Sequence, residues 1–170
     1  MPAELRQQFL GIVVAETERL SRLVNQVLDL AKIESGHAEW HNSDVDLFAL
    51  LTQAVQTTRE MYRERGASLE LQLPDTPVPT LRLDADRLTQ VVLNLLTNAA
   101  KFMPPGNGHV RLHLEHDTAG LTLSVHDNGP GIPADHRAMI FDRFHQGSHH
   151  PDRPQGTGLG LPISWQIVRH

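Results

Sequence analysis

The first 34 residues constrain the fold of this chain most, because they form one long amphipathic segment. Apolar side chains recur at steps of three and four residues from Leu5 to Ile33, which is the spacing of one helical face. Pro2 is tolerated in a first helical turn and Gly36 is a natural stop, so the pattern predicts a helix from Pro2 to about Glu34. Such a helix cannot bury its own stripe. We expect it to pack in a bundle or against a second copy, with a surface position on the following domain as the alternative.

The remaining residues predict a mixed α+β domain. Residues 37–43 read as a polar connector. Helical periodicity, two-residue alternation and glycine or proline stops then define the further elements. In chain order we expect a helix from Asp46 to near Gly66, strands 68–73 and 80–83, a helix from Asp84 to Phe102, strands 109–116 and 121–127, and a last helix after Gly160. A long helix followed by a layered helix-and-sheet domain is the predicted fold class.

Composition excludes several classes of function. The 170 residues suit one domain, or one domain with an appendage. The absence of cysteine removes disulfide scaffolds, thiolate zinc sites and cysteine nucleophiles. With 15 basic against 20 acidic residues, neither nucleic acid nor an anionic membrane is the expected partner. No apolar run approaches the roughly 20 residues that span a bilayer and no signal peptide opens the chain, so we expect a cytoplasmic piece without direct membrane contact.

Two glycine-containing clusters predict close approach of backbone to a ligand. In the first, residues 127–133 (DNGPGIP), a strand ends in a carboxylate and two glycines follow. In the second, residues 156–162 (GTGLGLP), glycines lead into a helix start, where free N–H groups and the helix dipole favour an anion such as phosphate. Two clusters around one loop indicate a phosphate-binding site more strongly than either cluster alone.

The familiar alternatives for such a site do not fit. The chain has no G-x-x-x-x-G-K-[ST] motif, and Gly156 follows a polar loop, which excludes a P-loop nucleotidase and disfavours a dinucleotide-binding domain. The H-R-D and D-F-G elements of eukaryotic-type kinases are absent. Half of a zinc deaminase signature occurs twice, but the cysteines that it requires do not exist here.

The helix predicted over residues 84–102 carries a polar row on one face. Asn94, Asn98 and Lys101 follow one another at steps of four and three. Two carboxamides and a cation among apolar neighbours are costly unless a ligand or loop satisfies them. A carboxamide oxygen suits Mg²⁺, and a lysine neutralises phosphate oxygens.

These motifs together resemble the two-component sensor histidine kinases. Residues 94–102 (NLLTNAAKF) resemble the N box of that family, 127–131 the G1 box, 141–144 (FDRF) the F box and 156–160 the G2 box, in the family's order and spacing. Residues 18–20 and 28–36 are similar to the second helix of the family's dimerisation and phosphotransfer hairpin. The resemblance therefore covers nearly the whole chain.

The resemblance implies two domains and a fold. Residues 1–38 would be part of the second hairpin helix, and residues 39–170 a C-terminally truncated ATP-binding catalytic domain. The implied fold is the Bergerat-type two-layer α/β sandwich shared with Hsp90, gyrase and MutL.

The resemblance also implies a role for each motif residue, with ATP and Mg²⁺ as cofactors. Asp127 would accept a hydrogen bond from the adenine amino group. Asn98 would ligate Mg²⁺, with Asn94 beside it as a possible second ligand, and Lys101 would contact phosphate; these three form the implied catalytic set. The further implied nucleotide-binding residues are Phe102, Gly129, Gly131, Ile132, Phe144, Thr157, Gly158, Leu159 and Gly160. Residues from about Asp142 to Gln155 would form a lid over ATP.

The implied activity is transfer of the ATP γ-phosphoryl group to a histidine, for relay to the receiver domain of a response regulator. Relatives that hydrolyse ATP place a glutamate where this chain has Asn94, which cannot act as a base, so hydrolysis is disfavoured as the main activity. An ATP-sensing regulatory module without phosphotransfer remains an alternative, and so does a serine kinase of the anti-sigma-factor type.

The chain departs from the family pattern in two places. The phosphoacceptor motif His-Glu-x-x-x-Pro surrounds none of its 11 histidines, and the strands that usually follow the last helix are lacking. We therefore expect a fragment of a larger sensor kinase that does not phosphorylate itself alone. Its parent would form a homodimer through the N-terminal helix, and the sequence leaves open whether that parent is anchored in a membrane.

Overall fold

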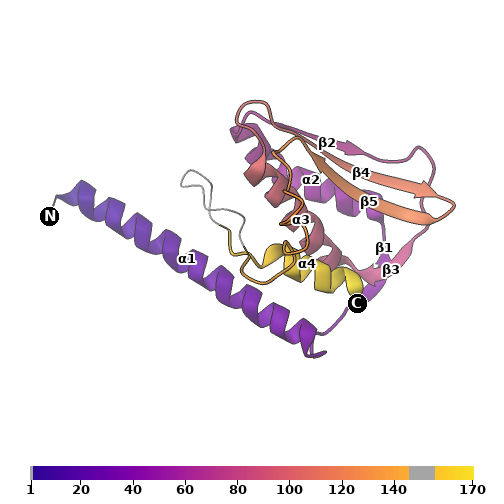
Figure 1. Ribbon diagram of the computed structural model, residues 1–170, viewed down its shortest axis with the longest axis horizontal. Helices are drawn as coiled ribbons and strands as arrows, with labels where there is room; N and C mark the ends of the chain where they lie inside the picture. Colours follow the sequence, from indigo (N-terminus) through magenta and orange to yellow (C-terminus); the bar gives the residue numbers. More distant parts are fainter. Residues whose placement is uncertain (1, 146–155) are drawn as a thin grey trace. The chain divides into compact units, whose positions relative to one another are not determined.

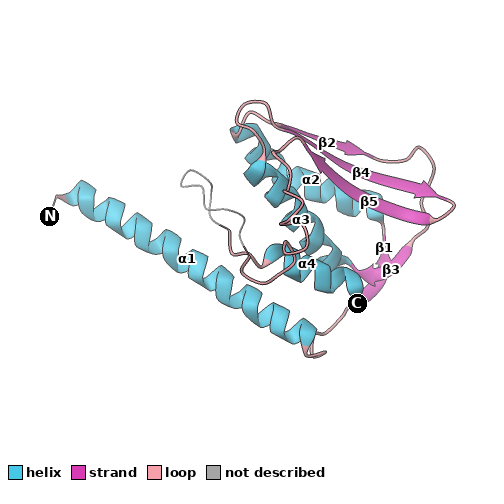
Figure 2. Cartoon of the chain, viewed as in Figure 1, coloured by secondary structure: helices cyan, strands magenta, loops and turns pink. Residues whose placement is uncertain are grey.

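The computed structural model describes residues 2–145 and 156–170. Internal contacts divide the chain into two compact units, Met1–Ala38 and Glu39–His170. The first unit is the helix α1 (Ala3–Glu34) with a short turn after it. The second unit holds the other elements (Figures 1 and 2): β1 (Asn42–Val45), α2 (Leu47–Glu64), β2 (Ser68–Gln72), β3 (Leu81–Asp84), α3 (Ala85–Phe102), β4 (His109–Asp117), β5 (Gly120–Asp127) and α4 (Gly160–Arg169).

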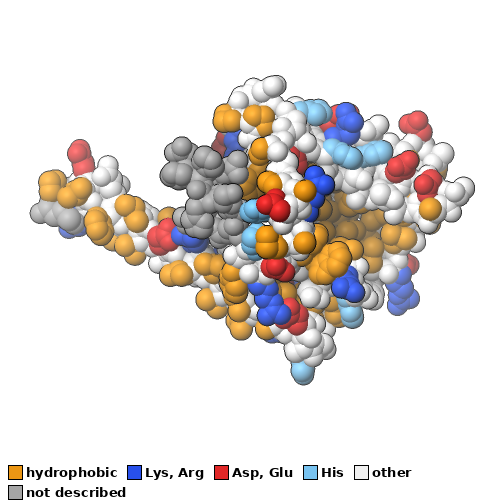
Figure 3. All heavy atoms as spheres, viewed as in Figure 1, with side chains coloured by type: hydrophobic (Ala, Val, Ile, Leu, Met, Phe, Trp, Pro, Cys, Tyr) orange, Lys and Arg blue, Asp and Glu red, His pale blue; other side chains and the backbone are white. Residues whose placement is uncertain are grey.

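Helix α1 confirms the long helix predicted from the apolar periodicity. It ends at a glycine in the left-handed region: Gly36 has φ of 71°, its N–H donates to the Ile33 carbonyl, and the N–H of His37 donates to the Lys32 carbonyl. Large apolar side chains remain exposed along its length (Figure 3), including Phe9 at 62% and Leu20 at 61%. A stripe of this width left in water is the mark of an interaction surface.

No helix in the described ranges, 2–145 and 156–170, combines the length and the apolar character that a crossing of a lipid bilayer requires.

The second unit is a two-layer arrangement of helices on a sheet (Figure 1), as the α+β prediction requires. Its larger sheet has the order β2-β4-β5, in which β2 runs parallel to β4 and β5 runs antiparallel to β4. Helices α2 and α3 pack on one face of this sheet, and α4 packs against α3.

The core lies between α2, α3 and the inner face of β4. Along β4, the apolar side chains of Val110, Leu112 and Leu114 alternate with exposed or half-exposed residues and are at most 2% exposed. Leu51 from α2 and Leu96 from α3 are fully buried against the same core. Burying a side chain of this size contributes about 1.5–3 kcal/mol, so this seam fixes how α3 lies on the sheet.

A second, two-stranded sheet was not predicted as such. Strand β1 occupies residues that overlap the polar connector predicted over 37–43, and it pairs antiparallel with β3, Asn42 opposite Asp84 and Val45 opposite Leu81. Its sequence, NSDV, has only one buried side chain, so alternation could not mark it as a strand. Pairing with a distant segment decides its conformation.

Asp84 joins this small sheet to the start of α3. Its side chain accepts hydrogen bonds from the N–H of Arg87 at 3.0 Å, as the N-cap of α3, and from the N–H of His41 at 2.8 Å, and it is only 7% exposed. Burial alone would raise the pKa of this carboxyl. The N–H donors and the Arg87 guanidinium outweigh burial and hold the pKa below its usual value of 3.8.

Replacing Asp84 with alanine is expected to lower the free energy of unfolding by about 1–3 kcal/mol, because one helix cap and the part-buried N–H of His41 lose their acceptor. Since the folded pKa is lowered, this stabilisation is fully present above the unfolded pKa near 3.8 and is lost as the pH falls through the folded value. Urea unfolding between about pH 7 and pH 2 measures both effects. Asp44→Ala, at an exposed position on β1, is the control, and equal stability of the two variants at neutral pH would contradict the assignment.

Candidate functional site

Helix α3 presents its polar row at the edge of the core. Val92, Leu96 and Ala100 on its buried face are at most 1% exposed, whereas Asn94, Asn98 and Lys101 are half-buried. The residues of the row lie within one to three positions of fully buried ones, so packing of the apolar face sets where the polar row points. The predicted row is therefore held by a helix whose opposite face is fully buried in the core.

Asn94 connects α3 to the start of α4. Its side-chain Nδ2 donates to the carbonyl of Gly160 and to the Oγ of Ser164, both at 3.3 Å. A methyl group at Gly160 would lie 3.6 Å from the carboxamide, which is ordinary contact, so the two helices meet closely here. The donors of Asn94 thus position α4, and its oxygen is the atom left for a ligand.

Lys101 brings the second glycine cluster to the same helix. A methyl group built at Gly156 would lie 2.5 Å from Lys101 Nζ, so any larger residue at position 156 would displace the ammonium group. The ammonium group also lies 5.1 Å from the centre of the Phe102 ring. Burial lowers the pKa of Lys101 from its usual value of 10.5, because removal from water penalises the charged form. A bound anion would relieve that penalty.

The first glycine cluster meets the last turn of α3. The N–H of Gly129 donates to Asp127 Oδ1 at 2.8 Å. A methyl group at Gly129 would lie 2.7 Å from that oxygen and 3.1 Å from the Phe102 carbonyl oxygen, so a larger residue would have to displace the Asp127 carboxylate. Asp127 is exposed and keeps its second carboxylate oxygen for another donor.

The first residues of the predicted lid contact the second glycine cluster. The N–H of Phe144 donates to the Gly158 carbonyl at 3.0 Å, and a methyl group at Gly158 would lie 2.8 Å from the Phe144 backbone. Phe144 has φ of 59°, an unusual value for a residue with a side chain. The N–H of Leu159, the residue before α4, donates to the Thr157 hydroxyl at 3.3 Å. Residues 146–155 of the predicted lid lie outside the described residues.

The remaining predicted residues, Gly131 and Ile132, lie in the loop that follows β5. Ile132 is 43% exposed, and its carbonyl accepts from Arg137 Nε at 3.1 Å. Gly131 has φ of 71°, and a methyl group there would meet open space. Its glycine is required by backbone conformation and not by close approach.

Two residues that the sequence did not indicate as part of the site make hydrogen bonds in or beside it. Ser164 was counted only as a helical residue, but it is buried and accepts from Asn94. Asn128 bridges the first glycine cluster to the start of β4: its Oδ1 accepts from the N–H of His109 and its Nδ2 donates to the Asn107 carbonyl, both at 2.8 Å. Ser164 lies within the predicted last helix, and Asn128 lies in the first glycine cluster, but the residues that Asn128 contacts are 19 and 21 positions earlier in the chain, so no local pattern marks it as a connector.

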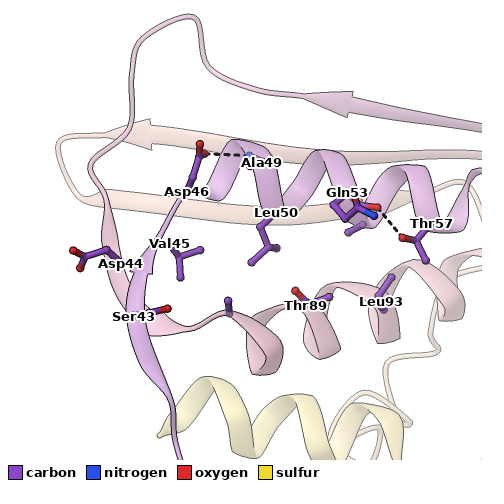
Figure 4. A pocket seen from close by; sticks show the side chains of 12 residues that line it. Ser43, Asp44, Val45, Asp46, Ala49, Leu50, Gln53, Thr57, Thr89 and Leu93 are labelled. Atoms are coloured by element: carbon purple, nitrogen blue, oxygen red, sulfur yellow. Dashed lines mark hydrogen bonds between the residues drawn. The ribbon is translucent and has the colours of Figure 1, made fainter.

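A separate groove lies between α2, β1 and the first half of α3 (Figure 4). Its volume is about 340 Å³, and its lining includes Leu50, Gln53 and Leu93 but none of the predicted nucleotide residues. The Asp46 side chain beside it is occupied as the N-cap of α2, accepting from the N–H of Ala49 at 3.1 Å. This groove is not the candidate site.

The geometry at the end of α3 is compatible with an anionic ligand. Lys101 and Asn94 contact the glycine-rich segment that leads into α4, Asn98 lies half-buried between them on α3, and a carboxylate with a spare oxygen lies near the end of the same helix. A ligand with phosphates at one end and a hydrogen-bond donor at the other would satisfy all of these groups.

Comparison with known proteins also indicates a nucleotide-binding domain. Residues 83–170 match the family described as "Histidine kinase-, DNA gyrase B-, and HSP90-like ATPase". The circadian input-output histidine kinase CikA of Synechococcus elongatus is 37% identical over 169 residues, which cover 97% of this chain and 22% of CikA. The chain thus spans about a fifth of that relative's length.

Two solved structures share the fold and more than 30% of the sequence. Full-length ShkA in complex with AMPPNP has a TM-score of 0.83 and 32% identity, covering 99% of this chain and 34% of ShkA. The mycobacterial sensor histidine kinase MprB has a TM-score of 0.62 and 34% identity, covering 76% of this chain and 79% of the solved MprB chain.

The family match over more than half of the chain, and a site built from the same motifs, lead to one conclusion: the chain belongs to the histidine kinase-, DNA gyrase B- and HSP90-like ATPase family and contains an ATP-binding catalytic domain of the sensor histidine kinase type.

Proposed function

We propose that this chain binds ATP with Mg²⁺ and that, in the full-length protein, it transfers the γ-phosphoryl group to a histidine outside this chain for relay to a response regulator receiver domain. The observation that carries the proposal is the contact of Lys101 Nζ with Gly156, which brings a half-buried cation against the glycine-rich start of α4. This contact is what a polyphosphate requires of a protein without a P-loop.

The residues present fit a magnesium ion held mainly by its nucleotide. Within the described ranges, no group of three or more His, Asp or Glu side chains could hold a metal by itself. Magnesium in phosphoryl-transfer sites keeps several waters and takes only one or two protein ligands besides the phosphates. The carboxamide oxygens of Asn98 and, as a second candidate, Asn94 supply ligands of that type.

Each residue has one task in the proposed reaction. When bound, ATP and Mg²⁺ supply the phosphoryl group and the charge that neutralises its oxygens. Lys101 neutralises further phosphate charge, and the glycines at the start of α4 admit the phosphates to its N–H groups. The spare carboxylate oxygen of Asp127 accepts from the adenine amino group, which guanine lacks at that position. Phosphoryl transfer requires mainly this alignment and neutralisation.

The exposed stripe of α1 supports a homodimer as the assembly in which transfer occurs. Ten large apolar side chains of this helix are between 42% and 62% exposed: Leu5, Phe9, Leu10, Ile12, Val13, Val14, Leu20, Val24, Val27 and Leu28. Burying them against a second helix would contribute far more than any polar contact on the same surface. We place this assembly in the cytoplasm.

Asp127→Asn is expected to weaken ATP binding about 10- to 100-fold, because the amide keeps an acceptor for the Gly129 N–H but presents a donor to the adenine amino group. Isothermal titration calorimetry with Mg²⁺ measures the loss. The matched control is Asp75→Asn, which changes an exposed carboxylate in the loop after β2. Absence of ATP binding by the folded wild-type chain would refute the proposed function.

The affinity for ATP is expected to fall as the pH rises from 7 towards 10, because burial has lowered the pKa of Lys101 and only its charged form attracts phosphate. The Lys101→Met variant should bind ATP more weakly at pH 7 and lack this pH dependence. Adenosine, which has no phosphates, serves as the control ligand. A wild-type affinity that stays constant over this range would contradict the role of Lys101.

Full-length protein incubated with γ-labelled ATP is expected to yield an acid-labile, base-stable phosphoryl group, the signature of phosphohistidine. Asn98→Ala should lower the yield because a metal ligand is lost. Thr97→Ala, at the exposed neighbouring position on α3, should not lower it. An acid-stable product would instead indicate a serine kinase, and no product despite ATP binding would indicate a binding module.

A further inference from the structure

The last turn of α3 leaves one buried carbonyl without its helical partner. The carbonyl of Ala100 would normally accept from the N–H of residue 104, but that residue is proline and has none. Ala100 is 1% exposed, so solvent cannot take the place of the missing donor. An unsatisfied buried carbonyl at this position would favour fraying of the turn that carries Lys101.

Arg65 supplies the missing donor. It is the residue that follows α2, and its Nη1 donates to the Ala100 carbonyl. The positive charge also lies at the C-terminal end of α3, where the helix dipole favours a cation. The backbone of Arg65 makes a second link, because its carbonyl accepts from the N–H of Gly106 at 3.4 Å, just beyond the prolines that end α3.

Tyr62 holds the preceding turn of the same helix. Its hydroxyl donates to the carbonyl of Leu96 at 2.7 Å, and the side chain is 1% exposed. Burial, and after it the negative charge of Asp127, raise the pKa of Tyr62 well above its usual range, so the hydroxyl stays protonated and remains a donor. Leu96 and Ala100 are four residues apart, so Tyr62 and Arg65 bond carbonyls on the same side of α3 in two successive turns.

The candidate phosphate-binding side chains lie on the other side of these two turns. Asn98 is two residues from Leu96 and two from Ala100, which places it on the opposite side of the helix from both, and Lys101 follows in the same turn. A rotation or partial unwinding of residues 96–102 would therefore move Asn98 and Lys101 together. The contacts from α2 oppose that movement.

We propose that Arg65, assisted by Tyr62, is a positioning residue for the phosphate end of the nucleotide: the two side chains hold the last two turns of α3 so that Asn98 and Lys101 keep their ligand-binding geometry. This inference rests on the proposed ATP binding. It differs from a purely stabilising role because the loss of Arg65 should affect the phosphates more than the adenosine moiety, whose acceptor is Asp127 at the end of β5.

The test compares the affinities of folded variants for MgATP and for adenosine, each measured by competition with a fluorescent nucleotide. Arg65→Met removes the donor but keeps the length of the side chain. It is expected to weaken MgATP binding about tenfold, the order of loss seen when groups that orient ligand-binding side chains are removed. Its affinity for adenosine should change by less than about twofold. Arg65→Lys, which keeps a donor, should restore most of the MgATP affinity.

Arg63→Met is the matched control, since Arg63 lies on the exposed side of the same turn and pairs with Glu60 on the surface at 2.6 Å. It should change neither affinity. Tyr62→Phe, which removes a single hydroxyl, provides the second variant and carries the test if Arg65→Met does not fold. It should shift the ATP-to-adenosine affinity ratio in the same direction.

Three results overturn the inference. An unchanged ATP-to-adenosine ratio in both Arg65→Met and Tyr62→Phe would show that the contacts only stabilise the fold. Failure of Arg65→Lys to recover MgATP binding, with the variant folded, would show that the donor is not what matters. A folded wild-type chain that binds no ATP would refute the proposed function itself, an outcome that the wild-type titration separates from the other two.

Discussion

The burial of one face of α3 is the interaction on which the rest of the second unit depends. Leu96 from this helix packs among α2 residues and the inner side chains of β4, such as Leu112, and all of these are excluded from water. Because interiors pack as densely as organic crystals, a helix held in this way has little freedom to rotate. The positions of Asn98 and Lys101, on the opposite side of the helix, are fixed by the same packing. The candidate site is therefore built on the core and not on a loop.

Three glycines allow the backbone to lie close to neighbouring groups in the site. Gly156 makes room for the Lys101 ammonium, Gly129 for the Asp127 carboxylate and Gly158 for the Phe144 backbone; in each case a methyl group would come within 3.0 Å of a neighbour. At positions 129 and 156 glycine lets a charged side-chain end approach the backbone, whereas Gly131 adopts a positive φ and has open space around it. The same residue type thus has two physical roles in one site.

The regular elements and the polar row could be predicted because local signals define them. Periodicity predicts the long N-terminal helix, α2, α3 and the strands joined near Gly120. Asp46 marks the start of α2, Asp84 the start of α3 and Pro104 the end of α3. Strand β1 could not be predicted, because a short polar segment becomes a strand only when β3 lies beside it. The parallel pairing of β2 with β4 likewise brings together segments on either side of α3, and no local pattern encodes that choice.

By itself, the sequence determined most of the helices and strands, several of their ends, and which chemical groups line one face of α3, since those properties arise from neighbours within a few residues. Only the tertiary structure decided what those groups contact. The partners of Asn94 are 66 and 70 residues away, and the donors from Tyr62 and Arg65 reach carbonyls 34 and 35 residues further along the chain. Such contacts exist only after the core has packed, because burial of apolar faces brings the helices together and the polar groups must then find partners within reach.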